Sequence, residues 1–433
     1  MEQDQSLVLN QQSKKRKLPE EYHHDDHDDH GMLDFSLDEL LNQDLLERVL
    51  SWLPTSSFFR LRSVCKRWSS VAASASFRLA CSQIPSRDPW FFMVDNHLDQ
   101  SIVFDTSERN WKHLKRPLLL HQNHPNRSNL IPVAASGGLI CFRSTVSGGF
   151  LISNPVTSAC RELPPPLPPA FQNQTIHAIA MNSPSRQHSS SYSLVLVSGE
   201  LPHLSVWVYE SGKDCWGEEI KLSRKMDEDS QESDVGGDEV LYFLSKAGDV
   251  VATNMQRSPS KQYSSVITVK DGEEIIYFLS SSGTVLACNL VKKSFFEYPR
   301  LLPVCFEYSI DIVECKGEML VVVLSEFLES ASLRVWRFSE EEKEEKDRSW
   351  CQIAAMPPSM AHEFYGKKAD INCVGSGDQK RLMICVNSGE FSRYMLCDLE
   401  ANDWTELPKC VVDGKPKEFM SAFSFEPRIE ARV

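Results

Sequence analysis

The sequence predicts two folded parts of different class, a short helical domain followed by a much larger all-β domain built from repeated sheets. Two observations support this prediction. Between residues 36 and 80, apolar residues recur at steps of three and four, the spacing of amphipathic helices. From Trp90 onward, short apolar runs alternate with polar turns and return at intervals of about 50 residues. We therefore divide the chain into residues 1–33, 34–82 and 88–428.

The bulk composition is that of an ordinary globular protein. Of the 433 residues, 41% are hydrophobic and 24% are charged, and the formal net charge of −14 argues against a chain that coats nucleic acid or an anionic membrane. No apolar run approaches the roughly 20 residues that cross a bilayer, and the first residues lack the pattern of a secretory signal. The 13 cysteines include no Cys-x-x-Cys pair, so we expect reduced, mostly buried thiols and no zinc or redox site.

Residues 1–33 are polar and low in complexity, and we predict that they form a disordered tail. The basic run Lys14-Lys15-Arg16-Lys17 is either a nuclear import signal or an ordinary basic run of a tail, so we expect the protein in the nucleus, the cytoplasm or both. The His/Asp run at 23–30 is interpreted as solvated tail in preference to a weak site for divalent metal.

Residues 34–82 are predicted to form three short helices. Asp44, with Glu47 three residues later, predicts a capped helix start, and Pro54 predicts its end. The following Thr-Ser-Ser offers new N-caps. Beyond it, one face of a helix pair is predicted by the spacing of Phe58, Leu61, Cys65, Trp68 and Ala72.

The β part repeats an apolar strand, a polar turn and then an aromatic residue. The same six-residue spacing separates Asp105 from Trp111, Glu210 from Trp216, Asn289 from Phe295 and Asp398 from Trp404. Several copies end in proline, at Pro164, Pro299, Pro357 and Pro408. Units of this size, each with about four strands, predict a β-propeller, because stacked blades hide the faces that a single sheet cannot bury.

The blade count and the closure of the ring follow from the same repeats. Seven units are favoured, and six are possible because the 35-residue interval between the copies at 236 and 271 is tight for a full blade. The strand-like segment 419–427 is expected to complete the first blade beside residues 90–94. The tryptophan after each turn is expected to pack against the neighbouring strand or blade.

The helical segment resembles the F-box, a family pattern of about 45 residues. The matching stretches are Leu41 to Leu46, Leu53-Pro54 and Arg62-Ser63-Val64-Cys65-Lys66-Arg67-Trp68, with Asn42 where the family usually has proline. The remainder resembles the kelch-type propeller of plant F-box/kelch proteins, through "VFDTSERNW" (103–111), "SNPVT" (153–157) and the paired glycines at 137–138 and 236–237.

The resemblance implies a substrate-recognition subunit of a Skp1–cullin–F-box ubiquitin ligase. The F-box would dock on a Skp1-like adaptor, which links it to cullin and RING subunits, and the propeller rim loops would hold a target protein. Helix-in-groove contacts use anchors at i, i+3, i+4 and i+7. The alternative interpretation of such residues is that they form the domain's own core. Our candidate adaptor contacts are Leu41, Leu45, Leu53, Pro54, Val64 and Trp68.

No enzyme signature stands out, so we predict no catalytic residue, metal or cofactor, and no direct nucleic-acid or membrane partner. Two alternatives remain open. The same modules could form a non-degradative scaffold or transcriptional co-regulator, or the propeller could carry a hydrolase site at its central channel. The acidic stretches 223–239 and 339–350 are interpreted as solvated loops that could also repel or recruit a basic partner.

Overall fold

The structure is a computed structural model, and it divides into two compact units, a helical unit (Met1–Pro85) and a propeller unit (Ser86–Val433). The predicted tail lies outside the described residues, as do Leu41 and most of the acidic stretches. The structure describes residues 42–95, 101–114, 130–166, 175–183, 191–225, 242–244, 250–252, 262–280, 283–301, 308–327, 329–339, 349–376 and 379–433.

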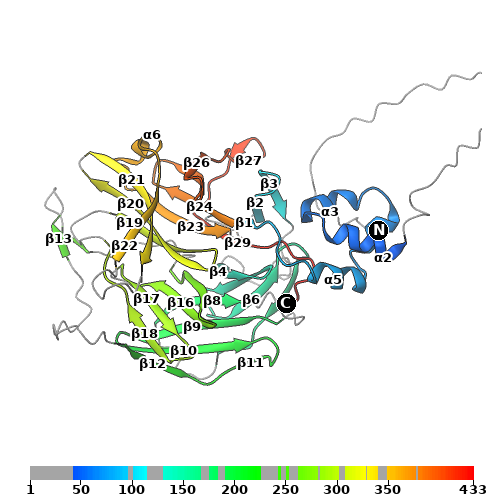
Figure 1. Ribbon diagram of the computed structural model, residues 1–433, viewed down its shortest axis with the longest axis horizontal. Coiled ribbons are helices and arrows are strands. Elements are labelled where there is room, and N and C mark those ends of the chain that lie inside the picture. Colours follow the sequence, from blue (N-terminus) through cyan, green and yellow to red (C-terminus); the bar gives the residue numbers. More distant parts are fainter. Residues whose placement is uncertain are drawn as a thin grey trace, which may run out of the picture. The chain divides into compact units, whose positions relative to one another are not determined.

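In the described part of the helical unit the chain forms four helices, one more than predicted (Figure 1, blue). The additional helix is α5, because the chain turns after Val71 and Ser74 starts a new helix by accepting the Phe77 N–H at 3.4 Å. The helices are α2 (Gln43–Ser51), α3 (Thr55–Leu61), α4 (Lys66–Val71) and α5 (Ala75–Ser82).

The start of α2 corrects the predicted cap. Asn42, not Asp44, is the N-cap, and its side-chain oxygen accepts the Asp44 N–H at 3.4 Å. Asparagine caps helices as well as aspartate does, so the residue that precedes the helix takes the position. Asp44 then lies in the first turn, where its charge favours the helix dipole. Glu47 is released from the predicted capping box and turns towards α5.

The core of the helical unit lies between α2, α3 and α5. Leu46 and Leu50 of α2 are each 2% exposed, and Phe58 of α3 stacks on Phe77 of α5 with ring centroids 4.8 Å apart. Full burial of each such side chain contributes about 1.5–3 kcal/mol. The inward face of α2 is therefore what holds these short helices together.

The described residues of the propeller unit form six four-stranded blades, each of which runs from an innermost to an outermost strand. The first blade contains β29 (Ser421–Phe425), β1 (Trp90–Val94), β2 (Ser101–Asp105) and β3 (Asn110–Leu114); the second, β4 (Leu130–Ser136), β5 (Leu139–Ser144), β6 (Phe150–Asn154) and β7 (Ala159–Glu162); the third, β8 (Ile176–Asn182), β9 (Ser193–Glu200), β10 (His203–Glu210) and β12 (Ile220–Arg224), with the short β11 (Cys215–Trp216) also on β10. The fourth contains β15 (Ser265–Lys270), β16 (Glu273–Leu279), β17 (Val285–Asn289) and β18 (Ser294–Glu297); the fifth, β19 (Tyr308–Cys315), β20 (Glu318–Phe327), β21 (Ser330–Ser339) and β22 (Ser349–Ala355); the sixth, β23 (Asp370–Ser376), β24 (Gln379–Asn387), β25 (Ser392–Asp398) and β26 (Asp403–Glu406).

These blades close into a ring. The innermost strands lie side by side in the order β29, β4, β8, β15, β19 and β23, and β23 lies against β29. Closure depends on the predicted pairing of the C-terminal strand, which is confirmed: β29 pairs antiparallel with β1, from Trp90 opposite Phe425 to Val94 opposite Ser421.

The favoured count of seven blades is therefore wrong for the described chain, and the alternative of six is right. Within the segment interpreted as an additional blade, the described residues form a two-stranded hairpin, β13 (Tyr242–Leu244) with β14 (Val250–Ala252). No space remains for a blade there, because β12 of the third blade pairs in parallel with β18 of the fourth. The Ser223 N–H donates to the Lys293 carbonyl at 3.0 Å, and the Lys225 N–H donates to the Phe295 carbonyl at 2.8 Å.

The repeated turn between the third and fourth strands has a local explanation. Its first residue is an Asp or Asn whose side-chain oxygen accepts backbone N–H groups from the residues that follow, as Asp105 does for Ser107 at 2.9 Å. Its last residue adopts the left-handed conformation, with φ of 52° at Arg109. The same side-chain acceptor occurs at Asn154, Asn289 and Asp398.

The tryptophans that follow these turns link neighbouring blades, as predicted. Trp111 of the first blade donates its indole N–H to the carbonyl of Pro408, which follows the sixth blade, at 2.9 Å. In the same way, at 2.8 Å, Trp216 of the third blade donates to Pro164 after the second. A third pair joins Trp350 of the fifth blade to Pro299 after the fourth, also at 2.8 Å. Trp404 differs, because it donates to Asn402 of its own turn at 3.1 Å.

Candidate functional site

The structure places the predicted adaptor contacts of the helical unit largely at its surface. Leu45 is 51% exposed and Val64 is 65% exposed. Pro54 is also exposed, whereas Leu53 and Trp68 are half-buried. None of these five lies in the buried core, which is the position that the alternative interpretation required.

Helix α2 has two apolar sides, one buried and one exposed. Leu46 and Leu50 point inward and are buried. Leu45, Val49 and Trp52 lie at i, i+4 and i+7, and they are 51%, 51% and 64% exposed. We call these three residues the α2 stripe. Sequence reasoning missed Val49 and Trp52 as contacts, although their spacing from Leu45 was a signal for them.

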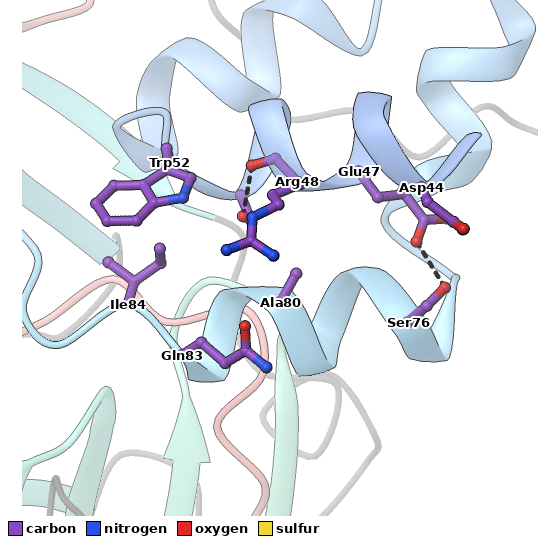
Figure 2. Close-up of a pocket in the computed structure, with 9 residues that line it drawn as sticks. Asp44, Glu47, Arg48, Trp52, Ser76, Ala80, Gln83 and Ile84 are labelled. Atoms are coloured by element: carbon purple, nitrogen blue, oxygen red, sulfur yellow. Dashed lines mark hydrogen bonds between the residues drawn. The ribbon is translucent and has the colours of Figure 1, made fainter. Parts of the chain in front are cut away.

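A groove of about 350 Å³ runs between α2 and α5 (Figure 2). Trp52 and Ile84 lie at one end of the groove, and Asp44 and Ser76 lie at the other. Trp52 therefore belongs to both the groove and the α2 stripe. The groove is lined by Asp44, Glu47, Arg48, Ser51, Trp52, Ser76, Ala80, Gln83 and Ile84.

The side chain of Glu47 ties the helices together at this groove. Its carboxylate accepts hydrogen bonds from the Ser76 hydroxyl at 2.6 Å and from the Gln43 amide at 3.0 Å. Gln43 in turn accepts the Nε–H of Arg67, on α4, at 3.2 Å. Burial acts to raise the pKa of Glu47, but hydrogen bonds from Ser76, Gln43 and Ser74 outweigh it and lower the pKa below the ordinary value. Glu47 is therefore an anion at neutral pH.

The propeller unit has two rims of different character. Each blade has four antiparallel strands, so every connection from an outermost strand to the next innermost strand lies at the same rim. In the described chain this rim carries helix α6 (Pro358–Ala361), the 3-10 helix η4 (His362–Phe364) and the hairpin of β27 (Val411–Val412) with β28 (Lys415–Pro416). Tyr365 and Val411 are 40% and 60% exposed there. The opposite rim carries the short turns described above.

The described residues lack two kinds of feature. They contain no group of three or more His, Cys, Asp or Glu side chains placed to hold a metal ion. Nor does any helix within them have the length and apolar character needed to cross a membrane.

Family comparisons match the two parts of the chain separately. Residues 39–79 match the family model of the F-box domain. Residues 103–361 match the family model of the KIB1-4 beta-propeller, which covers more than half of the chain.

Three relatives from Arabidopsis thaliana extend the match. F-box only protein 13 is 50% identical over 407 residues, covering 92% of this chain and 86% of the relative. F-box only protein 6 is 25% identical over 414 residues, covering 93% and 77%. An F-box/kelch-repeat protein is 32% identical over 210 residues, covering 46% and 49%. The chain therefore belongs to the plant F-box family whose members carry a C-terminal β-propeller.

Proposed function

We propose that this protein is the substrate-recognition subunit of a Skp1–cullin–F-box ubiquitin ligase. The helical unit docks on a Skp1-like adaptor, and the long-connection rim of the propeller unit holds the target protein. The observation that supports the proposal is the α2 stripe, an apolar row exposed on the unit that matches the F-box domain.

The exposed row is what a helix-in-groove partner needs. Residues at i, i+4 and i+7 of a helix point to one side, so Leu45, Val49 and Trp52 offer three successive anchors. Exposed tryptophan is unfavourable in water, and its removal from water is a common source of binding energy at interfaces. Val64 adds a further exposed apolar side chain, at the turn between α3 and α4.

The proposed role requires no active site in this chain. Catalysis belongs to the partner subunits, and this protein holds the target near them, so that an encounter in solution becomes a reaction within one complex. Such positioning contributes large rate effects. The family to which the chain belongs supports this non-catalytic role.

The experiment is a titration of the full chain with a purified Skp1-like adaptor by calorimetry. The variant Val49→Asp/Trp52→Asp places two charges in the interface, and we expect its affinity to fall by at least about 100-fold. Val291→Asp is the matched control, because Val291 is 68% exposed on a turn of the propeller unit. Undiminished binding by a folded double variant would refute adaptor docking through the α2 stripe.

A second measurement separates a degradative role from that of a scaffold. Proximity labelling in cells identifies the proteins that lie near the propeller unit. If the protein marks its target for degradation, the half-life of such a protein lengthens when the α2 stripe is mutated. An unchanged half-life, with the complex retained, supports the scaffold alternative instead.

We further propose that Lys14-Lys15-Arg16-Lys17, which lie outside the described residues, direct part of the protein to the nucleus. Replacement of all four by alanine is expected to shift a fluorescent fusion towards the cytoplasm. An unchanged distribution would contradict this proposal.

A further inference from the structure

The contact between Ser76 and Glu47 joins an accessible hydroxyl to a buried charge. Ser76 lies in the first turn of α5, is exposed and lines the groove. Glu47 is only 3% exposed, and its carboxylate accepts the Ser76 hydroxyl at 2.6 Å. Figure 2 shows this hydrogen bond spanning the groove from α2 to α5.

The surroundings of Glu47 make it sensitive to further negative charge. The donors that lower its pKa, Ser76, Gln43 and Ser74, are all neutral, and Arg67 donates to Gln43. Asp44 adds a second carboxylate to the same end of the groove. A buried anion that loses a donor and gains a like-charged neighbour is strongly destabilised.

We propose that Ser76 is a phosphorylation site whose modification releases α5 from α2 and switches adaptor docking off. The inference rests on the proposed function, because the switched activity is adaptor binding. In the modification step, the Ser76 oxygen forms a bond to the γ-phosphorus of a nucleoside triphosphate held by a protein kinase. The bond to the leaving nucleoside diphosphate breaks, and the hydroxyl proton passes to a base of the kinase.

Phosphorylation has two consequences at this contact. The hydroxyl no longer has a proton to donate, so Glu47 loses the 2.6 Å hydrogen bond, the shorter of its two bonds to Ser76 and Gln43. A phosphate with nearly two negative charges then stands beside the buried carboxylate. Both effects act at the packing of α2 on α5, and α2 also carries the α2 stripe, whose Trp52 lines the same groove.

Two opposing effects are smaller. Phosphate near the N-terminus of α5 is favoured by the helix dipole, and Arg48 on the groove could approach it. Both interactions are formed in solvent, since Ser76 and Arg48 are exposed, and solvent screens such pairs. The repulsion of Glu47 is formed next to a buried group, where screening is weaker.

The experiment uses the full chain with phosphoserine incorporated at position 76, titrated with a purified Skp1-like adaptor. We expect the phosphorylated chain to bind at least about tenfold more weakly than the unmodified chain. Ser76→Asp is expected to weaken binding in the same direction. Ala75→Asp is the matched control, because Ala75 is the exposed neighbour at the same helix end and makes no hydrogen bond to Glu47. Its binding is expected to equal that of the unmodified chain.

The decisive variant is Ser76→Asp/Glu47→Gln, which removes the repelled charge. We expect it to recover most of the lost affinity, with Glu47→Gln alone as its reference. Failure of this recovery, or equal binding by Ser76→Asp and Ala75→Asp, would overturn the inference.

Hydrogen exchange of the α2 amides tests the switch independently of the adaptor. Faster exchange in the phosphorylated chain supports release of α5 from α2, even if the unmodified chain fails to bind the adaptor and the proposed function falls. Unchanged exchange would overturn the inference while leaving adaptor docking intact. In cells, phosphate at Ser76 is expected only in the adaptor-free fraction, and its absence from both fractions would also refute the switch.

Discussion

Replacement of Trp216 by phenylalanine tests whether indole-to-carbonyl hydrogen bonds hold the blades together. Trp216 is 8% exposed, and its N–H donates to the carbonyl of Pro164 across the boundary between the second and third blades. Phenylalanine keeps most of the ring packing but removes the donor. A net hydrogen bond contributes about 0.5–1.5 kcal/mol, and a carbonyl left unsatisfied costs about 1–3 kcal/mol. We expect the free energy of unfolding to fall by about 2 kcal/mol.

Trp404→Phe is the matched control for this change. Trp404 is 7% exposed but donates to Asn402 within its own turn. Asn402 is exposed, so water replaces the lost donor, and we expect a loss below about 1 kcal/mol. The assay is guanidinium chloride unfolding, read as the shift of the midpoint at constant slope. If Trp216→Phe destabilises the protein no more than Trp404→Phe, the blade-to-blade role of the hydrogen bond is refuted.

Three further predictions concern other contacts. Asn154→Ala removes an amide that donates to two carbonyls of the C-terminal segment, Arg428 at 2.9 Å and Ala431 at 3.0 Å. We expect the free energy of unfolding to fall by about 1–3 kcal/mol and amide exchange after residue 426 to become faster, whereas unchanged exchange would contradict the anchoring role. Gly375→Ala places a Cβ 1.8 Å from the Glu314 carbonyl oxygen, so the fifth and sixth blades must move apart. We expect loss of soluble protein in an expression test, and a normal yield would refute the close packing of these two blades at Gly375. Because the pKa of Glu47 is lowered on folding, its ionised form stabilises the folded state at pH values above the ordinary pKa of 4.5, and this stability is lost as the pH falls through the folded-state pKa. We therefore expect the unmodified chain to lose stability more steeply on acidification than Glu47→Gln, and parallel stability curves would contradict this prediction.

The repeat of the propeller unit was predictable because its causes are local. An acceptor side chain at the first turn position and a left-handed residue at the last lie within five residues, so the turn chemistry is visible in sequence. The pairing of 419–427 with the first blade was also predictable, because ring closure requires a strand at the C-terminus. The F-box signature at Arg62–Trp68 identified the helical unit in the same way.

The remaining features depend on contacts that no local pattern contains. The segment near residue 242 resembles the copy at 271, yet the distant pairing of β12 with β18 leaves it outside the ring. In α2, the four apolar residues Leu45, Leu46, Val49 and Leu50 are adjacent around the helix, so periodicity could not show which pair packs inward. The groove was missed because part of its lining comes from α5 and the residues that follow it.

Because β12 pairs with β18, the contact between the third and fourth blades is independent of the length of the chain that connects them. Forty residue positions, 225–264, lie between the end of β12 and the start of β15. Main-chain hydrogen bonds join the two blades directly, so the contact between them does not depend on the length of that stretch. We therefore expect a change in the length of that stretch to leave the pairing of β12 with β18, and with it the circle of blades, intact.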